Sequence, residues 1–113
     1  MSKTPNRDHI PPGTLDMLIL KTLARAKELH GFEIAEAIER VSADVLQVEE
    51  GSLYPALQRM LMKGWVYAQW GKTAENRRAR YYRLTVAGRR QLEHEVDSYR
   101  RVSHAIGRIL QPA

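Results

Sequence analysis

The chemistry that this 113-residue sequence indicates most strongly is the binding of an anion by clustered basic side chains. Residues 72–90 carry seven Lys and Arg against one acidic residue, whereas residues 1–71 and 91–113 together carry eleven against twelve. The formal net charge of +5 therefore comes from one short stretch. Such a stretch favours a polyanion or an anionic membrane surface as partner, although a surface that only keeps the protein soluble has a similar composition.

Most of these basic residues surround a hairpin that the hydropathy pattern predicts. Alternating apolar residues predict strands over 65–70 and 79–84, separated by a polar loop over 71–78. The tip of this loop has no apolar residue that would pack on a core, so we expect its cations to contact phosphates or a DNA minor groove. Arg80 and Arg83 can equally pair with Glu75 or with the second helix. The candidates on the hairpin are Lys72, Arg77, Arg78 and Arg80.

A helix predicted between Gly51 and Gly64 supplies the second set of candidates. The spacing of its apolar residues predicts a buried side made of Leu53, Leu57, Met60 and Leu61. A serine at its start is expected to act as the N-cap, and a proline in the first turn costs no intrahelical hydrogen bond. Glu49 and Glu50 stand at the leading edge, so at least one of them is expected to turn away from phosphates, cap the helix or accept from a cytosine amino group. The candidates for DNA contact on this helix are Ser52, Tyr54, Pro55, Gln58 and Arg59.

Three of these side chains suit particular groups of DNA. The tip of Tyr54 suits a phosphate oxygen or a thymine methyl group, and packing against the protein is its alternative. Gln58 has the amide pair that can bind adenine, and Arg59 has the forked guanidinium that can bind guanine or phosphate. The alternative for both is an ordinary solvated position on the helix.

Enzymatic chemistry has little support in the sequence. There is no cysteine, which excludes disulfides, thiol nucleophiles and cysteine-rich zinc sites. The four histidines, His9, His30, His94 and His104, show no metal-ligand spacing. No HExxH pattern and no glycine-rich phosphate loop occur. We therefore expect no catalysis, no metal and no cofactor.

The elements that position the candidates are mostly helices. A first helix begins at Leu15 and is expected to run to Gly31, and a second follows with Phe32, Ile34, Ile38 and Val41 on its buried side. A short strand is predicted over 45–48. In the hairpin, Trp65 and Trp70 are expected to cover the small core rather than to stack on bases.

The last helix, expected after a Thr85 cap, has an apolar seam spaced like a coiled coil. Because the first helix also has apolar residues around most of its circumference, we expect the two terminal helices to pair with a second copy of the chain. Docking onto the chain's own first helix is the alternative. The expected dimer residues are Leu15, Leu18, Ile19, Leu92, Val96, Tyr99, Val102, Ile106, Ile109 and Leu110.

The predicted fold is mainly α with a small β-hairpin, a winged helix-turn-helix followed by a C-terminal dimerisation helix. Its expected parts are a flexible N-terminal arm over 1–12, a DNA-binding domain over 13–85 and the dimerisation helix over 86–113. No stretch is apolar and long enough for a membrane span or a secretion signal. We therefore expect a cytoplasmic, nucleoid-associated protein.

Several motifs resemble the PadR family of bacterial transcriptional regulators. They are GSLYPAL…GW at 51–65, RRARYYRLT at 77–85 and AGRRQL at 87–92, with GTLDMLILKTL at 13–23 and HGFEIAEAIE at 30–39 extending the resemblance over nearly the whole chain. The resemblance implies a homodimer that binds palindromic operator DNA, usually as a repressor. It places Ser52, Tyr54 and Pro55 on the family's recognition helix, and Lys72, Arg77 and Arg78 on its wing. Where the family usually has a histidine, this chain has Gln58.

A protein-interaction module that does not bind DNA is the alternative function. RNA binding has less support, because the hairpin lacks the alternating exposed aromatic residues of a stacking platform. A small apolar effector can be accommodated between the paired terminal helices, near Met17, Tyr99 and Val102. Nothing in the sequence identifies such a ligand.

Overall fold

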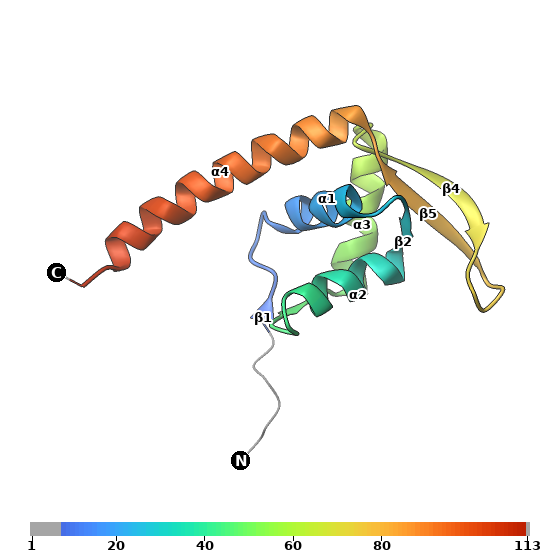
Figure 1. Cartoon of the computed structure of the whole chain (residues 1–113), viewed down its shortest axis with the longest axis horizontal. Coiled ribbons are helices and arrows are strands. Elements are labelled where there is room, and N and C mark those ends of the chain that lie inside the picture. The colour runs from blue at the N-terminus through green and yellow to red at the C-terminus, as the bar shows by residue number, and fades with distance from the viewer. Residues whose placement is uncertain (1–7, 113) are drawn as a thin grey trace, which may run out of the picture.

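The computed structural model describes residues 8–112 and is mainly helical, with two small sheets (Figure 1). The long C-terminal helix extends away from a body that holds all the other elements. This arrangement confirms the predicted fold class of a winged helix with an additional C-terminal helix. In chain order the elements are β1 (Asp8–His9), α1 (Leu15–Arg25), β2 (Leu29–His30), α2 (Gly31–Val41), β3 (Leu46–Gln47), α3 (Glu50–Met62), β4 (Val66–Lys72), β5 (Arg78–Leu84) and α4 (Val86–Leu110).

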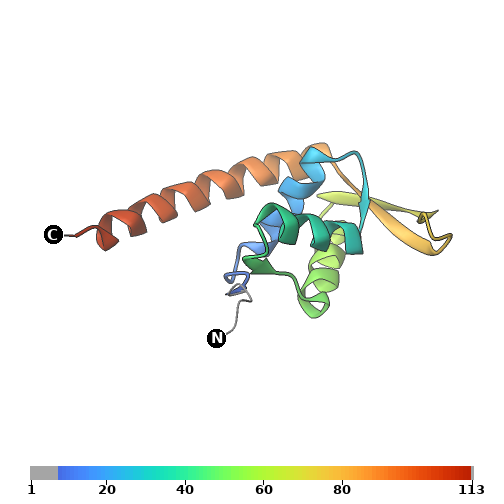
Figure 2. The ribbon, with the colours of Figure 1, turned by 60° about the horizontal axis from the view of Figure 1, so that its bottom comes forward.

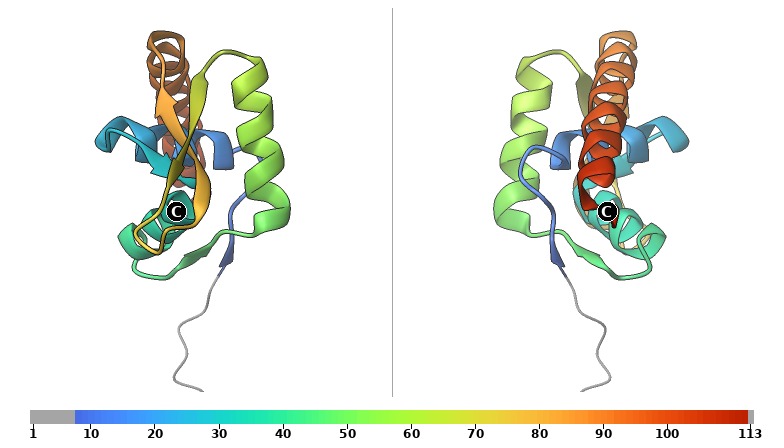
Figure 3. Two further views of the ribbon diagram at one scale, coloured as in Figure 1. Left: turned by 90° about the vertical axis from the view of Figure 1, so that its right-hand side faces the viewer. Right: turned by 90° about the vertical axis from the view of Figure 1, so that its left-hand side faces the viewer.

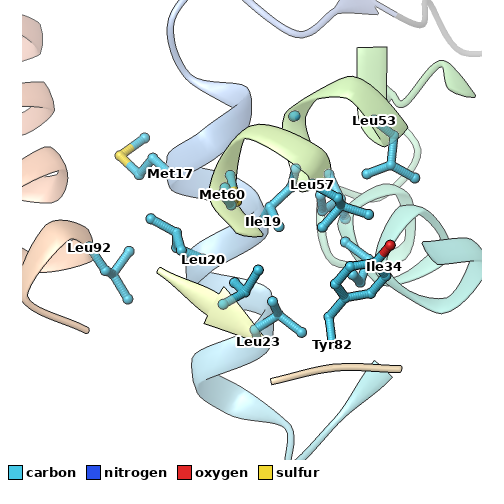
Figure 4. Close-up of a cluster of buried hydrophobic side chains, with 13 residues drawn as sticks. Met17, Ile19, Leu20, Leu23, Ile34, Leu53, Leu57, Met60, Tyr82 and Leu92 are labelled. Atoms are coloured by element: carbon cyan, nitrogen blue, oxygen red, sulfur yellow. The ribbon is translucent and has the colours of Figure 1, made fainter. Parts of the chain in front are cut away.

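The core lies where α1, α2 and α3 meet the base of the hairpin (Figure 4). Helix α3 contributes the side predicted from its spacing, with Leu53, Leu57 and Met60 almost fully buried. Tyr82 of β5 and Leu92 of α4 also reach this cluster, so the hairpin and the start of α4 are fixed to the three helices. Burial of these apolar side chains is the main source of stability in a domain of this size.

The hairpin is longer than the hydropathy pattern predicts. Strands β4 and β5 pair antiparallel from Val66 opposite Leu84 to Lys72 opposite Arg78, which leaves a turn of only Thr73–Arg77. Strand β2 adds to β5 and completes a three-stranded sheet in the order β2-β5-β4, a strand that the sequence did not reveal. We call β4, β5 and the turn between them the wing.

Two predicted helix boundaries are wrong. Helix α1 ends at Arg25, and Gly31 is the first residue of α2 rather than a terminator. Ser52 does not cap α3, because the N-cap is Glu49 and the helix begins at Glu50. Pro55 consequently lies beyond the first turn of α3, at an exposed position.

The N-terminal arm expected over 1–12 is anchored within its described part. Residues 1–7 lie outside the described residues, but Asp8–His9 forms the short parallel strand β1 beside β3. The backbone N–H of Asp8 donates to the carbonyl oxygen of Val45 at 2.7 Å. The chain therefore passes close to the start of α3 before it enters α1.

Helix α4 starts as predicted and then leaves the body (Figure 2). The Thr85 hydroxyl accepts from the backbone N–H of Gly88 at 3.0 Å and so caps the helix. Gly88 is buried where the first turn of α4 lies against Trp65, just before β4, and Leu84, at the end of β5, whereas every residue of 99–110 is exposed. The second half of α4 thus makes no core of its own.

Candidate nucleic-acid interface

A groove between the wing and the adjoining ends of α2 and α3 brings together two sets of candidates. Tyr54 and Gln58 of α3 line it from one side, and Arg77, Arg78 and Arg80 of the wing line it from the other. The left panel of Figure 3 looks at the molecule from the side on which the wing projects, with α3 beside it. The groove therefore combines hydrogen-bonding side chains from α3 with three guanidinium groups from the wing.

The strand register explains why two of these arginines face the groove. In an antiparallel ribbon, residues directly opposite each other lie on the same side, and so do residues two apart along one strand. Tyr82, near the base of the wing, points into the core. Arg80 and Arg78 follow it on the same side, so the face that packs on the helices becomes a basic face further out. Along the wing the side chains change from apolar to cationic at the point where the core ends.

Trp70 lies on this basic face and does not cover the core as predicted. It is directly opposite Arg80 in the register and its side chain is 58% exposed. The Arg78 guanidinium carbon lies 4.4 Å from the centre of the indole, and that of Arg80 lies 5.7 Å away. Trp65, by contrast, is partly buried and packs against the core as predicted.

The sequence left open whether the Tyr54 side chain faces outward or packs against the protein, and in the structure it does both. Its side chain is 46% exposed and lines the groove, but its ring also lies against Gly31 at the start of α2. A Cβ atom on Gly31 would come within 2.7 Å of the Tyr54 ring and hydroxyl. Gly31 thus gives the room in which Tyr54 lies between the two helices and still faces the groove.

Charges near the groove act on the buried tyrosine beside it. Burial raises the pKa of Tyr82, the charge of Arg80 opposes that rise, and Tyr54 adds to it.

Phe32, predicted to be buried, is 67% exposed and lines the same groove. Because α2 begins at Gly31, Phe32 occupies the first turn on the side away from Ile34, where it stacks on His30 with 6.4 Å between ring centres.

Comparison with known proteins identifies the family. Residues 19–94 match the model of the transcriptional regulator PadR-like family. The chain belongs to the PadR-like family. Members of this family are DNA-binding regulators with a winged helix and are not enzymes. The resemblance carried by the recognition-helix and wing motifs is thereby confirmed.

Two solved structures and one curated sequence show how far the likeness to this PadR-like chain extends. A transcriptional regulator from Clostridium thermocellum has a TM-score of 0.79 and 23% identity over 88% of this chain and 95% of its own. A PadR-like transcriptional regulator from Bacillus cereus has a TM-score of 0.74 and 28% identity, covering 89% of this chain and 95% of its own. An uncharacterized protein X from Lysinibacillus sphaericus is 30% identical over 100 residues, which are 88% of this chain and 91% of that protein.

The remaining candidates on α3 of this PadR-like chain line a second groove. Ser52, Pro55 and Arg59 lie on the other edge of α3 and face α1 and α4. Nη2 of Arg59 is 2.8 Å from Oδ1 of Asp16, so this guanidinium joins α3 to α1. Lys72 is exposed at the outer end of β4, and its carbonyl oxygen accepts from the Tyr81 hydroxyl at 3.1 Å.

Both acidic residues at the start of α3 have a structural position. Glu49 is the N-cap residue, and its carboxylate lies 3.6 Å from Nδ1 of His9. Glu50 is the first residue of the helix, where a negative charge is favourable to the helix dipole. Neither residue lines the groove beside the wing.

Arg83, on the other face of the wing, pairs with neither predicted partner. Its Nε lies 3.2 Å from Glu28, in the segment between α1 and β2, and Nη1 donates to the Tyr67 hydroxyl at 3.0 Å. The hydrogen bond with Tyr67 is the main cause that raises the pKa of Arg83. Arg83 therefore ties the wing to the body and is no candidate for DNA contact.

The residues expected at a dimer interface fall into two groups. Ile19 and Leu92 belong to the core of the chain itself, and Leu15, Leu18 and Val96 pack partly against that core. The others form an exposed apolar strip on the outer half of α4. Its members are Tyr99, Val102, Ile106, Ile109 and Leu110.

Within residues 8–112, no three His, Asp or Glu side chains are grouped so that they could hold a metal ion. None of the helices in this part of the chain has the length and hydropathy needed to cross a bilayer.

Proposed function

We propose that this PadR-like chain is a transcriptional repressor that binds a palindromic operator as a homodimer, in the cytoplasm and on nucleoid DNA. One observation carries the proposal: α3 and the basic face of the wing line a single groove, so one DNA duplex can contact both. A recognition helix in the major groove with a wing on the adjoining backbone or minor groove has this geometry.

The candidate side chains on α3 and the wing have different roles in this arrangement. The amide of Gln58 would bind adenine in the major groove, and the Tyr54 hydroxyl would donate to a phosphate oxygen. Lys72, Arg77 and Arg78 would follow the phosphates of one strand, with Arg80 nearer to α3. Because such contacts release condensed counterions, the affinity would fall steeply with salt.

The candidates on the other edge of α3 would complete the contact. Ser52 and Pro55 are exposed and would lie against the opposite wall of the same major groove. Arg59 would have to release Asp16 before it could reach a base or phosphate. We therefore expect Arg59 to contribute less to DNA affinity than the wing arginines.

Helix α4 supplies the dimer. The exposed strip on its outer half would pack on the same strip of a second copy, with α1 alongside. Two-fold symmetry would then present two copies of α3 to half-sites about one DNA turn apart, ~34 Å, which requires a palindromic operator.

Met17, Tyr99 and Val102 line one groove between α1, α3 and α4, where a small apolar effector would change the spacing of the two recognition helices.

A salt titration with duplex DNA of random sequence tests the proposal. We expect the wild-type protein to bind at low salt. The logarithm of its affinity should fall with the logarithm of the salt concentration with a slope of several units. The double variant R77Q/R78Q removes two wing charges and should lower the slope by roughly two for each subunit in contact with DNA. The matched control, R100Q/R101Q, removes two charges from the exposed outer half of α4 and should keep the wild-type slope.

The outcomes separate the two functional classes. Equal slopes for the wing variant and the α4 control would place the DNA surface elsewhere. A wild-type protein that does not bind duplex DNA at low salt would contradict the proposal and favour a protein-interaction module.

A further inference from the structure

Trp70 is a large aromatic side chain that does no packing in the core. It lies in the outer half of β4, outside both the core cluster and the partly buried side chains that pack against it. Burying an indole is a major source of stability, and this one stays more than half exposed. Because the core does not explain the position of Trp70, the explanation lies in the groups that contact its ring.

What covers the ring is a pair of guanidinium groups. Arg80 is directly opposite Trp70 in the strand register, and Arg78 is one pair nearer the tip on the same face. Their distances from the ring centre, 5.7 and 4.4 Å, lie within the range of a cation–π contact. Within residues 8–112 neither arginine has an ion pair with a carboxylate, so the indole is the partner that the two share.

The contact fixes side chains that would otherwise be free. An exposed arginine samples many rotamers, and it loses that freedom when it binds a phosphate. Two cations close together also repel each other, which favours conformations that separate them. The indole face holds both charges on the side of the wing that lines the groove with Tyr54 and Gln58.

We propose that Trp70 is a positioning residue for DNA binding: its indole holds Arg78 and Arg80 as a preformed pair of cations aimed at the phosphates of one DNA strand. The inference rests on the proposed function and adds to it a residue that carries no charge and need not touch DNA. The expected signature is a loss of affinity without a change in the number of counterions released.

The test compares W70A, W70F and R78Q with the wild type on labelled duplex DNA of random sequence over a salt series. W70A should lower the affinity about tenfold, the size expected when two arginine side chains must be ordered on binding rather than beforehand, with an unchanged log–log slope because no charge is removed. W70F should keep part of the affinity. R78Q should lower both the affinity and the slope. The matched control is Q69A, at an exposed position on the opposite face of the same strand, which should bind like the wild type.

A double-mutant comparison separates positioning from direct contact. In the R78Q/R80Q background, W70A should cause no further loss of affinity, because the groups that it positions are gone. A full tenfold loss in that background would overturn the inference and show that the indole itself contacts DNA. Wild-type affinity for W70A alone would also overturn it.

A measurement without DNA tests the geometry itself. In the free protein, the ring current of Trp70 should shift the side-chain NMR signals of Arg78 upfield, and W70A should abolish the shift. Absence of this shift in the wild type would overturn the inference while leaving the proposed function standing. A wild-type protein with the shift but without affinity for duplex DNA would instead contradict the proposed function.

Discussion

The body of the molecule and the outer half of α4 use the same apolar residues in opposite ways. Leu92, in the first part of α4, is 8% exposed, whereas Ile109, in the last turn of the same helix, is 80% exposed. The body buries a cluster of apolar side chains in one core, whereas the end of α4 buries none. A long helix with an apolar strip and nothing against it is stable in water only when another surface covers the strip. The body therefore has a core of its own, and the outer half of α4 carries the apolar strip that we propose a second copy of the chain covers.

The largest expected effect is in the core of the body. L57A removes a fully buried side chain from α3 and should lower the free energy of unfolding by about 2–5 kcal/mol, because the transfer free energy is lost and a cavity remains. Chemical denaturation measures the change. The control is Q58A, at the exposed neighbouring position. A loss no larger than that of the control would show that α3 is not held by this core.

Substitutions in the outer half of α4 should weaken dimer association and leave the folding of the chain unchanged. V102E/I106E places carboxylates in the exposed strip and should raise the dissociation constant of the dimer about a hundredfold, since charges buried at an interface cost several kcal/mol. Sedimentation equilibrium measures this constant. R101Q, on the other side of the helix, is the control. A double variant that associates as the wild type does would refute pairing through this strip.

The junction between the two regions should be sensitive to a single methyl group. A Cβ atom on Gly88 would collide with the backbone carbonyl of Trp65 and the side chain of Leu84, so G88A should destabilise the fold by about 1–3 kcal/mol as α4 shifts. G107A in the same helix meets open space and should be neutral or slightly stabilising. Thermal unfolding of both variants checks this contrast. Equal melting temperatures for the two variants would show that the contact around Gly88 has room for a methyl group.

The smallest expected effect is a pH dependence confined to the body. Burial raises the pKa of Tyr82 in the folded state above that of the unfolded chain, near 10, so between the two values the folded state binds more protons. Stability should therefore be intact below about pH 10 and fall as the pH rises through the folded-state pKa. Y82F should reduce that fall, and Y99F on exposed α4 should not. Melting temperatures from pH 8 to about 11 test the sign.

Much of this arrangement follows from local patterns in the sequence. The buried side of α3, the Thr85 cap and the basic hairpin are set by residues within a few positions of one another, and each was predicted. The exposed strip on α4 was also predicted, because a spacing of three and four residues depends on the helix alone.

The differences arise where distant segments meet. Gly31 was interpreted as a helix terminator, but its lack of a side chain makes room for Tyr54, which is 23 residues away in the chain. Arg59 stays a predicted DNA contact, but the sequence did not reveal that Asp16 of α1 lies beside it. Trp70 was assigned to the core because the register that places it opposite Arg80 was not known. Each difference depends on a contact between elements that periodicity does not determine.

The most direct test of the account is an NMR titration of the full chain with duplex DNA. If one duplex contacts α3 and the wing together, the amide signals of residues 52–58 and 73–80 should shift with the same midpoint. Signals from residues 104–110, at the end of α4, should stay in place. Shifts confined to the end of α4, or separate midpoints for α3 and the wing, would contradict a single DNA surface made from both.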